Sequence, residues 1–203
     1  MLINDDQKEK IRAAIASVEA HTYGELVTVL ARKADDYRYI GLTWAALLAL
    51  VSPFALMMSP LWLDTQHYLI LQLAVFTVLA LLSQWQPVRR FLVPRKIAHW
   101  RAANLARRQF LENNLHHTEQ ESGLLIFVAE EERYVEIIAD RGISRHVAPE
   151  QWQDIVDEFT ESVKCGDTEG GFLRCIERCG ELLKHHCPAQ ETQNELPDHL
   201  VIL

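Results

Sequence analysis

Two long apolar stretches dominate the pattern of hydrophobic and polar positions along the chain. Residues 40–63 and 68–86 carry no charged side chain, and the polar residues 64–67 separate them. As helices rising 1.5 Å per residue they would measure about 36 Å and about 28 Å, against a hydrocarbon core of roughly 30 Å. The pattern therefore predicts a transmembrane hairpin over residues 39–88, with spans at 40–63 and 68–86, in preference to two buried helices of a soluble core.

Aromatic side chains lie near the ends of both predicted spans. Trp and Tyr are enriched where a membrane meets water, because their rings are apolar while their N–H or O–H groups stay hydrated. We therefore expect four such residues to anchor the hairpin at the two interfaces: Trp44, Trp62, Tyr68 and Trp85.

Positive charge flanks the predicted hairpin and is absent from its tip. Lys and Arg residues close to a span remain on the cytoplasmic side of a membrane. The basic residues that directly follow the second span include Arg89, Arg90, Arg95 and Lys96. This asymmetry predicts that both termini are cytoplasmic, and that these four side chains contact lipid headgroups.

The rest of the chain contains shorter periodic segments. Cap residues followed by apolar residues at helical spacing predict four helices, which begin at Asn4, at Pro94, at Pro149 and at either Asp167 or Thr168. We expect the second helix to reach about His116 and to lie along the membrane surface, with basic residues on one side and the apolar residues Ile97, Trp100, Ala103, Ala106 and Phe110 on the other. Short apolar runs rich in β-branched residues predict strands at 25–30, 124–128 and 134–139.

These elements predict an α/β fold, a small mixed β-sheet covered by helices, with the two-helix hairpin inserted into it. A single strand before the hairpin cannot be stable alone, so it should pair with the strands that follow the hairpin. We therefore expect residues 1–38 and 89–203 to form one domain, interrupted by the hairpin at 39–88 and ending in a polar tail from residue 188.

Charge and composition limit the classes of partner that the chain is expected to bind. The chain has 203 residues and a net charge of −8, which fits one domain plus an accessory element. A basic segment at 89–112 lies beside a predicted span, where contact with anionic lipid is a simpler interpretation than binding of nucleic acid. From Thr118 onward the net charge is −12, which would repel polyanions. We expect membrane lipids and another membrane protein as partners, and no nucleic acid.

Two groups of residues are candidates for metal chemistry. Carboxylates lie at predicted strand ends, and if those ends meet they offer oxygen ligands for Ca²⁺ or Mg²⁺: Glu25, Asp35, Asp36 and Asp140. The alternative is that each caps a turn or pairs with a neighbouring Arg. Cys175 and Cys179 lie near His185, His186 and Cys187, yet their place on an apolar helix face favours core thiols over a zinc site. Apart from the divalent cation, we expect no cofactor.

Several strings in the chain carry a family resemblance. They are Gly24-Glu25-Leu26-Val27-Thr28-Val29, the Asp35-Asp36-Tyr37-Arg38 sequence that enters the first span, and Tyr134 to Ile143 with the following Trp152. These residues, together with the closing stretch from Asn194 to Asp198, resemble the TPM-domain family, and more narrowly its bacterial membrane branch, in which a transmembrane hairpin interrupts the domain.

The resemblance implies a TPM-like sandwich in the bacterial inner (plasma) membrane, with two spans. Exported relatives of the family are associated with acid phosphatase activity, but the chain has no P-loop or nucleophile elbow that would indicate an enzyme. We therefore expect a non-enzymatic interaction or assembly module for another membrane protein. The alternative is a metal-assisted phosphomonoesterase that uses the four carboxylates.

Overall fold

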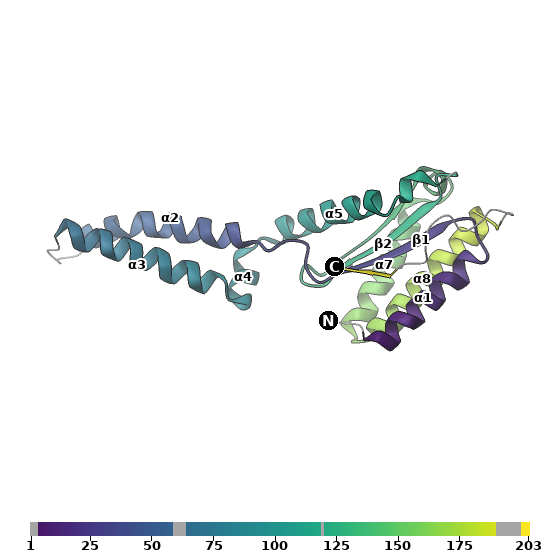
Figure 1. Ribbon diagram of the computed structural model, residues 1–203, viewed down its shortest axis with the longest axis horizontal. Helices are drawn as coiled ribbons and strands as arrows, with labels where there is room; N and C mark the ends of the chain where they lie inside the picture. Colours follow the sequence, from purple (N-terminus) through teal and green to yellow (C-terminus); the bar gives the residue numbers. More distant parts are fainter. Residues whose placement is uncertain (1–3, 59–63, 119, 190–199) are drawn as a thin grey trace. The chain divides into compact units, whose positions relative to one another are not determined.

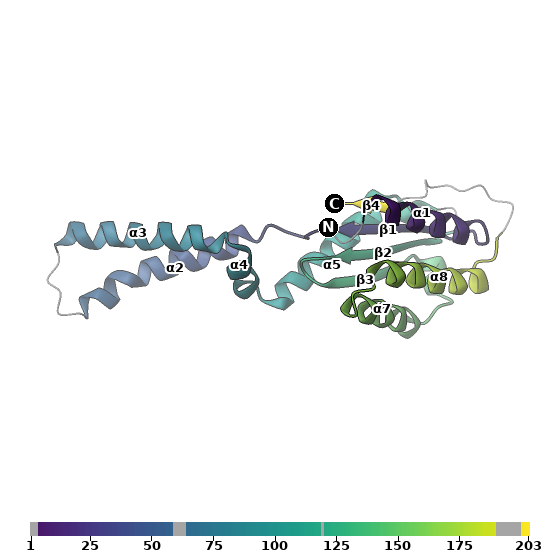
Figure 2. The same ribbon diagram turned by 90° about the horizontal axis from the view of Figure 1, so that it is seen from below.

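Four strands form one mixed sheet (Figure 1), and Figure 2 shows their order, β3-β2-β1-β4. The strands are β1 (Glu25–Ala31), β2 (Gly123–Ala129), β3 (Tyr134–Ala139) and β4 (Leu200–Ile202). Strand β1 is parallel to both β2 and β4, whereas β2 and β3 form an antiparallel hairpin. This confirms that the strand before the apolar hairpin pairs with a strand that follows it.

The computed structural model describes residues 4–58, 64–118, 120–189 and 200–203. The chain divides into two units. We call residues 1–34 and 99–203 the sheet unit, and residues 35–98 the hairpin unit.

Different helices cover the two faces of the sheet (Figure 2). One face packs against α1 (Asp5–Glu19), α7 (Pro149–Lys164) and α8 (Thr168–His186), and the other packs against α5 (Arg95–Glu112) and the 3₁₀ turn η1 (Leu115–His117). Strands β1 and β2 are therefore buried on both sides. This explains why their sequences are continuous apolar runs and do not alternate with polar residues.

Local capping fixes where the helices begin. The Asn4 side chain accepts a hydrogen bond from the Gln7 backbone N–H (3.0 Å), and the Gln7 side chain accepts one from the Asn4 N–H (2.8 Å). Asp167 likewise accepts from the Gly170 N–H at 3.0 Å, and Pro149 occupies the first turn of α7. These are the start signals that the sequence indicates, because each side chain satisfies backbone groups that a helix end leaves open.

The apolar residues predicted on one side of α5 are divided between its buried and its exposed sides. The sheet covers Ala102, Ala106 and Gln109, whereas Ile97 and Trp100 are 37% and 58% exposed. The expected residues recur mostly every third position, and each such step rotates 300°, which falls 60° short of a full turn. A row of this kind therefore winds around the helix, and its first members leave the sheet face.

Other differences from the sequence-based expectation are local. Helix α5 ends at Glu112, before the predicted end near His116. Asn114, just after it, adopts a left-handed conformation with φ of 56°. Two short helices, α4 (Gln86–Leu92) and α6 (Arg141–Ser144), were not predicted. The three-residue strand β4 was not predicted either, since three residues are too few for a periodic signal.

The hairpin unit consists of α2 (Arg38–Met57), α3 (Thr65–Ser83) and α4, so the two long helices start slightly before the predicted spans. Small residues four positions apart line the seam of α2 against α3: Gly41, Ala45 and Ala49, the last two only 2% and 4% exposed. A Cβ atom added at Gly41 would lie 2.6 Å from the Cβ of Ser83. The two backbones approach closely there, a packing that small residues at the interface also allow between membrane helices.

Candidate membrane anchor and candidate carboxylate site

Large apolar side chains cover the outside of α2 and α3. Leu50, Phe54 and Leu73 are 60%, 67% and 66% exposed, and both helices are long and apolar enough to cross a membrane. Only 22% of the apolar stretch Arg38–Ala55 is buried inside the protein. The pair thus differs from the core helices of a soluble protein, which would bury such residues.

The predicted interfacial aromatics occupy the ends of these helices. Trp44 is 49% exposed near the start of α2, and Trp85 is 67% exposed just after α3. Tyr68 lies in the first turn of α3 and is exposed. Trp62 lies outside the described residues. The three that are described stand at the ends of the apolar surface, which is where an interface would require them.

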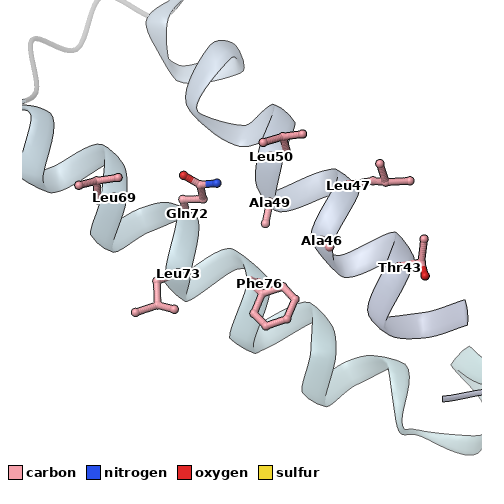
Figure 3. Close-up of a pocket in the computed structure, with 9 residues that line it drawn as sticks. All are labelled: Thr43, Ala46, Leu47, Ala49, Leu50, Leu69, Gln72, Leu73 and Phe76. Atoms are coloured by element: carbon pink, nitrogen blue, oxygen red, sulfur yellow. The ribbon is translucent and has the colours of Figure 1, made fainter. Parts of the chain in front are cut away.

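A cavity of about 550 Å³ opens between α2 and α3 (Figure 3). Its lining is mostly aliphatic and consists of Thr43, Ala46, Leu47, Ala49, Leu50, Leu69, Gln72, Leu73 and Phe76. The Thr43 hydroxyl donates to the Tyr39 carbonyl within its own helix at 2.7 Å. Gln72 contributes an amide to this otherwise apolar groove. Sequence analysis did not single out Gln72, although it is an amide within an uncharged 19-residue stretch.

The predicted headgroup ligands are partly described. Arg95 and Lys96 are exposed at the first turn of α5. The side chains of Arg89 and Arg90, on α4, lie outside the described part of the chain. Helix α5 carries five basic residues and one acidic residue, Glu112, so positive charge continues along this helix.

The candidate carboxylates fall at opposite ends of β1. Glu25 begins β1 and pairs with Gly123, the first residue of β2. The Asp140 N–H donates a hydrogen bond to the Gly123 carbonyl at 2.9 Å, so Glu25 and Asp140 share one end of the sheet. Asp35 and Asp36 follow the other end of β1, and six residue steps along a strand span about 20 Å. Two of the four predicted residues thus share one end of the sheet, and the other two follow the opposite end of β1 along the chain.

Each of these carboxylates has a local role that fits its position. Asp140 accepts from the Arg141 N–H at 2.7 Å and caps α6, while Asp35 accepts from the Asp36 N–H at 2.6 Å. Glu25 is only 6% exposed. Within the described ranges, no three His, Cys, Asp or Glu side chains are grouped so that they could hold a metal ion. The described residues thus give no support to a shared cation site on the four carboxylates, which stays a prediction.

The cysteines of α8 and its C-terminal end belong to the core. Cys175, Cys179 and Cys187 are 2%, 0% and 1% exposed, and their thiols are free. A hydrogen bond with Cys175, together with burial, raises the pKa of the Cys179 thiol. A hydrogen bond to the Cys187 thiol raises the pKa of Tyr23 to about 12, with burial as the second cause. The burial of Cys175 and Cys179 confirms their interpretation as core thiols.

Comparison with known proteins finds a similarity to a domain family and to a solved structure. Residues 88–182 match the model of the TPM domain. The NMR structure of the BA42 protein from the psychrophilic bacterium Bizionia argentinensis is similar, with a TM-score of 0.61 and 17% identity over 98% of this chain and 94% of that chain. At that identity the likeness is one of fold. Among curated proteins no match was found. Residues 88–182 are therefore similar to the TPM domain, and the chain shares its fold with the BA42 protein.

Proposed function

We propose that this chain is a membrane-anchored TPM domain that serves as a non-enzymatic interaction or assembly module for another membrane protein. The observation that carries the proposal is the exposed apolar surface of α2 and α3, on a chain whose sheet unit buries its own core. Burying a side chain such as Leu or Phe is worth about 1.5–3 kcal/mol relative to exposing it to water. A surface with many such residues is stable in a bilayer and unstable in solution.

The proposed location is the bacterial inner membrane, with α2 and α3 as two spans and both termini in the cytoplasm. The excess of Lys and Arg on the flanks supports this orientation, since the tip at residues 64–67 carries no positive charge. The exposed aromatics Trp44 and Trp85 support an insertion depth at which both side chains lie at the interface between membrane and water. The sheet unit would then face the cytoplasm, where free thiols such as those of α8 persist.

The groove around Gln72 is the surface that we assign to the partner. In a hydrocarbon environment an amide without a hydrogen-bond partner is costly. The groove of about 550 Å³ offers room for apolar side chains beside that amide. A transmembrane helix of another protein that presents a hydroxyl or amide group at this depth would fill the groove and form a hydrogen bond with the Gln72 amide. Such hydrogen bonds between helices, together with close packing, drive association in membranes.

Replacing Gln72 should weaken this association. Interhelical hydrogen bonds contribute roughly 0.6–1.7 kcal/mol, so Gln72→Leu should reduce capture of the partner about threefold to twentyfold. The measurement is photo-cross-linking from Leu69 in native membranes, with the captured membrane protein quantified by mass spectrometry. The matched control is Thr77→Val on the same helix, because the Thr77 hydroxyl already donates to the Leu73 carbonyl at 2.8 Å and its loss removes no bond to a partner.

Two results would count against the proposal. If Gln72→Leu and Thr77→Val captured the partner equally well, the groove would not be the contact surface. If the cross-linked product were only a dimer of this chain, the occupant would be a second copy and not another membrane protein.

A further inference from the structure

The outward side of α5 carries an exposed apolar row. The opposite side of the helix is covered by the sheet through Ala102 and Ala106. Ile97, Trp100 and Leu111 are 37%, 58% and 55% exposed. At 100° per residue these three side chains lie within an arc of about 60° on the helix surface. They lie on one side of the helix, with Asn104 between Trp100 and Leu111, and we call this side the α5 stripe.

Basic side chains border the α5 stripe on both sides. By the same helical geometry, Lys96 and Arg107 fall along one border, and Arg101 and Arg108 fall along the other. The Arg101 guanidinium lies over the Trp100 ring, 5.1 Å from its centroid. An apolar centre with an aromatic residue and flanking cations is typical of helices that lie in the interfacial plane of an anionic bilayer.

Charge on the two faces of the sheet differs in sign. On the α5 side, the helix carries five basic residues and one acidic residue. On the other side, α7 carries five acidic residues and one Lys. An anionic surface therefore attracts one face of the sheet unit and repels the other, and this gives the sheet unit a preferred orientation.

We propose that the α5 stripe is a second membrane contact, which docks the sheet unit on anionic phospholipid headgroups. This inference rests on the proposed membrane anchor and extends it beyond the residues next to the spans. Helix α5 begins in the last residues of the hairpin unit and continues into the sheet unit along the chain, so the anchor would hold the stripe at a high effective concentration near the surface. The exposed Trp100, Ile97 and Leu111 favour lipid over a purely ionic polyanion such as nucleic acid.

The test uses the full chain in nanodiscs, with a nitroxide label on an engineered Cys. Cys165→Ser removes the exposed native thiol, and the other three cysteines are buried. The label is placed by Asn104→Cys, within the arc of the α5 stripe, or by Gln153→Cys on the exposed side of α7 as a reference. In nanodiscs containing phosphatidylglycerol, the label at 104 should collide more with oxygen than with a water-soluble nickel chelate, and the label at 153 should show the reverse preference.

Charge removal should undock the helix. A Lys or Arg near an anionic surface strengthens binding roughly fivefold, so Arg107→Gln with Arg108→Gln should lower the docked-to-undocked ratio roughly thirtyfold. Arg12→Gln with Arg178→Gln removes the same charge from exposed positions on α1 and α8 and should leave the ratio unchanged. Phosphatidylcholine nanodiscs, or 1 M salt with its Debye length of about 3 Å, should act like the Arg107 and Arg108 substitutions.

Other outcomes would overturn the proposal. A label at 104 that is as water-accessible as the label at 153 in anionic nanodiscs would show a helix facing solution. A label that is shielded only after a protein or nucleic acid is added would assign the stripe to that partner. A chain that does not enter nanodiscs at all would refute the anchor itself, so the two proposals fail in distinguishable ways.

Discussion

Residues 89–203 expressed alone are expected to show no cooperative unfolding transition, although they contain β2, β3 and β4. They lack β1, which lies between β2 and β4 and pairs with both. They also lack α1, whose Ile11 and Ile15 are fully buried against the same sheet. Removing even one large core side chain costs about 2–5 kcal/mol, against a total stability of about 5–15 kcal/mol. The measurement is thermal unfolding followed by circular dichroism.

A matched protein, which we call the linked variant, keeps residues 1–38 and 89–203 and replaces 39–88 with a Gly/Ser linker. It retains all four strands, so it should be soluble without detergent and unfold in one cooperative transition. A C-terminal fragment that melted as cooperatively as the linked variant would show that β1 is not needed by the sheet. A linked variant that stayed unfolded in water would show that the sheet unit depends on the hairpin.

Gly123→Ala should be the most damaging of the small substitutions, because β2 begins against the backbone of η1. A Cβ at Gly123 would lie only 2.9 Å from the Leu115 carbonyl carbon and also overlap its oxygen. A backbone group cannot rotate away as a side chain can, so we expect a loss of about 3 kcal/mol in the free energy of unfolding. Urea titration of the linked variant measures the loss as a lower midpoint at unchanged slope.

Gly166→Ala is the control for Gly123→Ala. Gly166 adopts φ of +86° after α7, and a Cβ there would meet no atom within 4 Å. The control therefore carries a conformational cost of about 1 kcal/mol and no steric one. Equal losses for the two substitutions would contradict the close packing of η1 on β2.

The parts of the fold that follow from strong local patterns were predictable. Strands that are buried on both faces leave uninterrupted apolar runs, and capping residues such as Asn4 and Asp167 mark helix starts by their own chemistry. Strand β4 was not predictable, because three residues leave no period and the pairing partner lies far away in the sequence. The side of α5 that faces the sheet depends on tertiary packing, which a row of apolar residues does not specify.

The candidate carboxylates show which residue positions could be predicted from the sequence and which required the strand pairing. Glu25 begins β1, whereas Asp35 follows the opposite end of that strand along the chain, so the length of β1 gave no reason to group them. That Glu25 and Asp140 share one sheet end follows from the antiparallel pairing of β2 with β3, which turns the chain back to where β2 began. The groove at Gln72 required the structure, because its volume depends on how α2 and α3 diverge.

The most direct test of the account is the membrane topology of the full chain. A reporter enzyme that is active only outside the cytoplasm should be inactive when fused after Leu203, because the basic flanks keep both termini inside. The same reporter inserted at Thr65, in the tip between α2 and α3, should be active. Activity at Leu203 with none at Thr65 would reverse the orientation, and inactivity at both positions with recovery of the chain in the soluble fraction would contradict the membrane anchor.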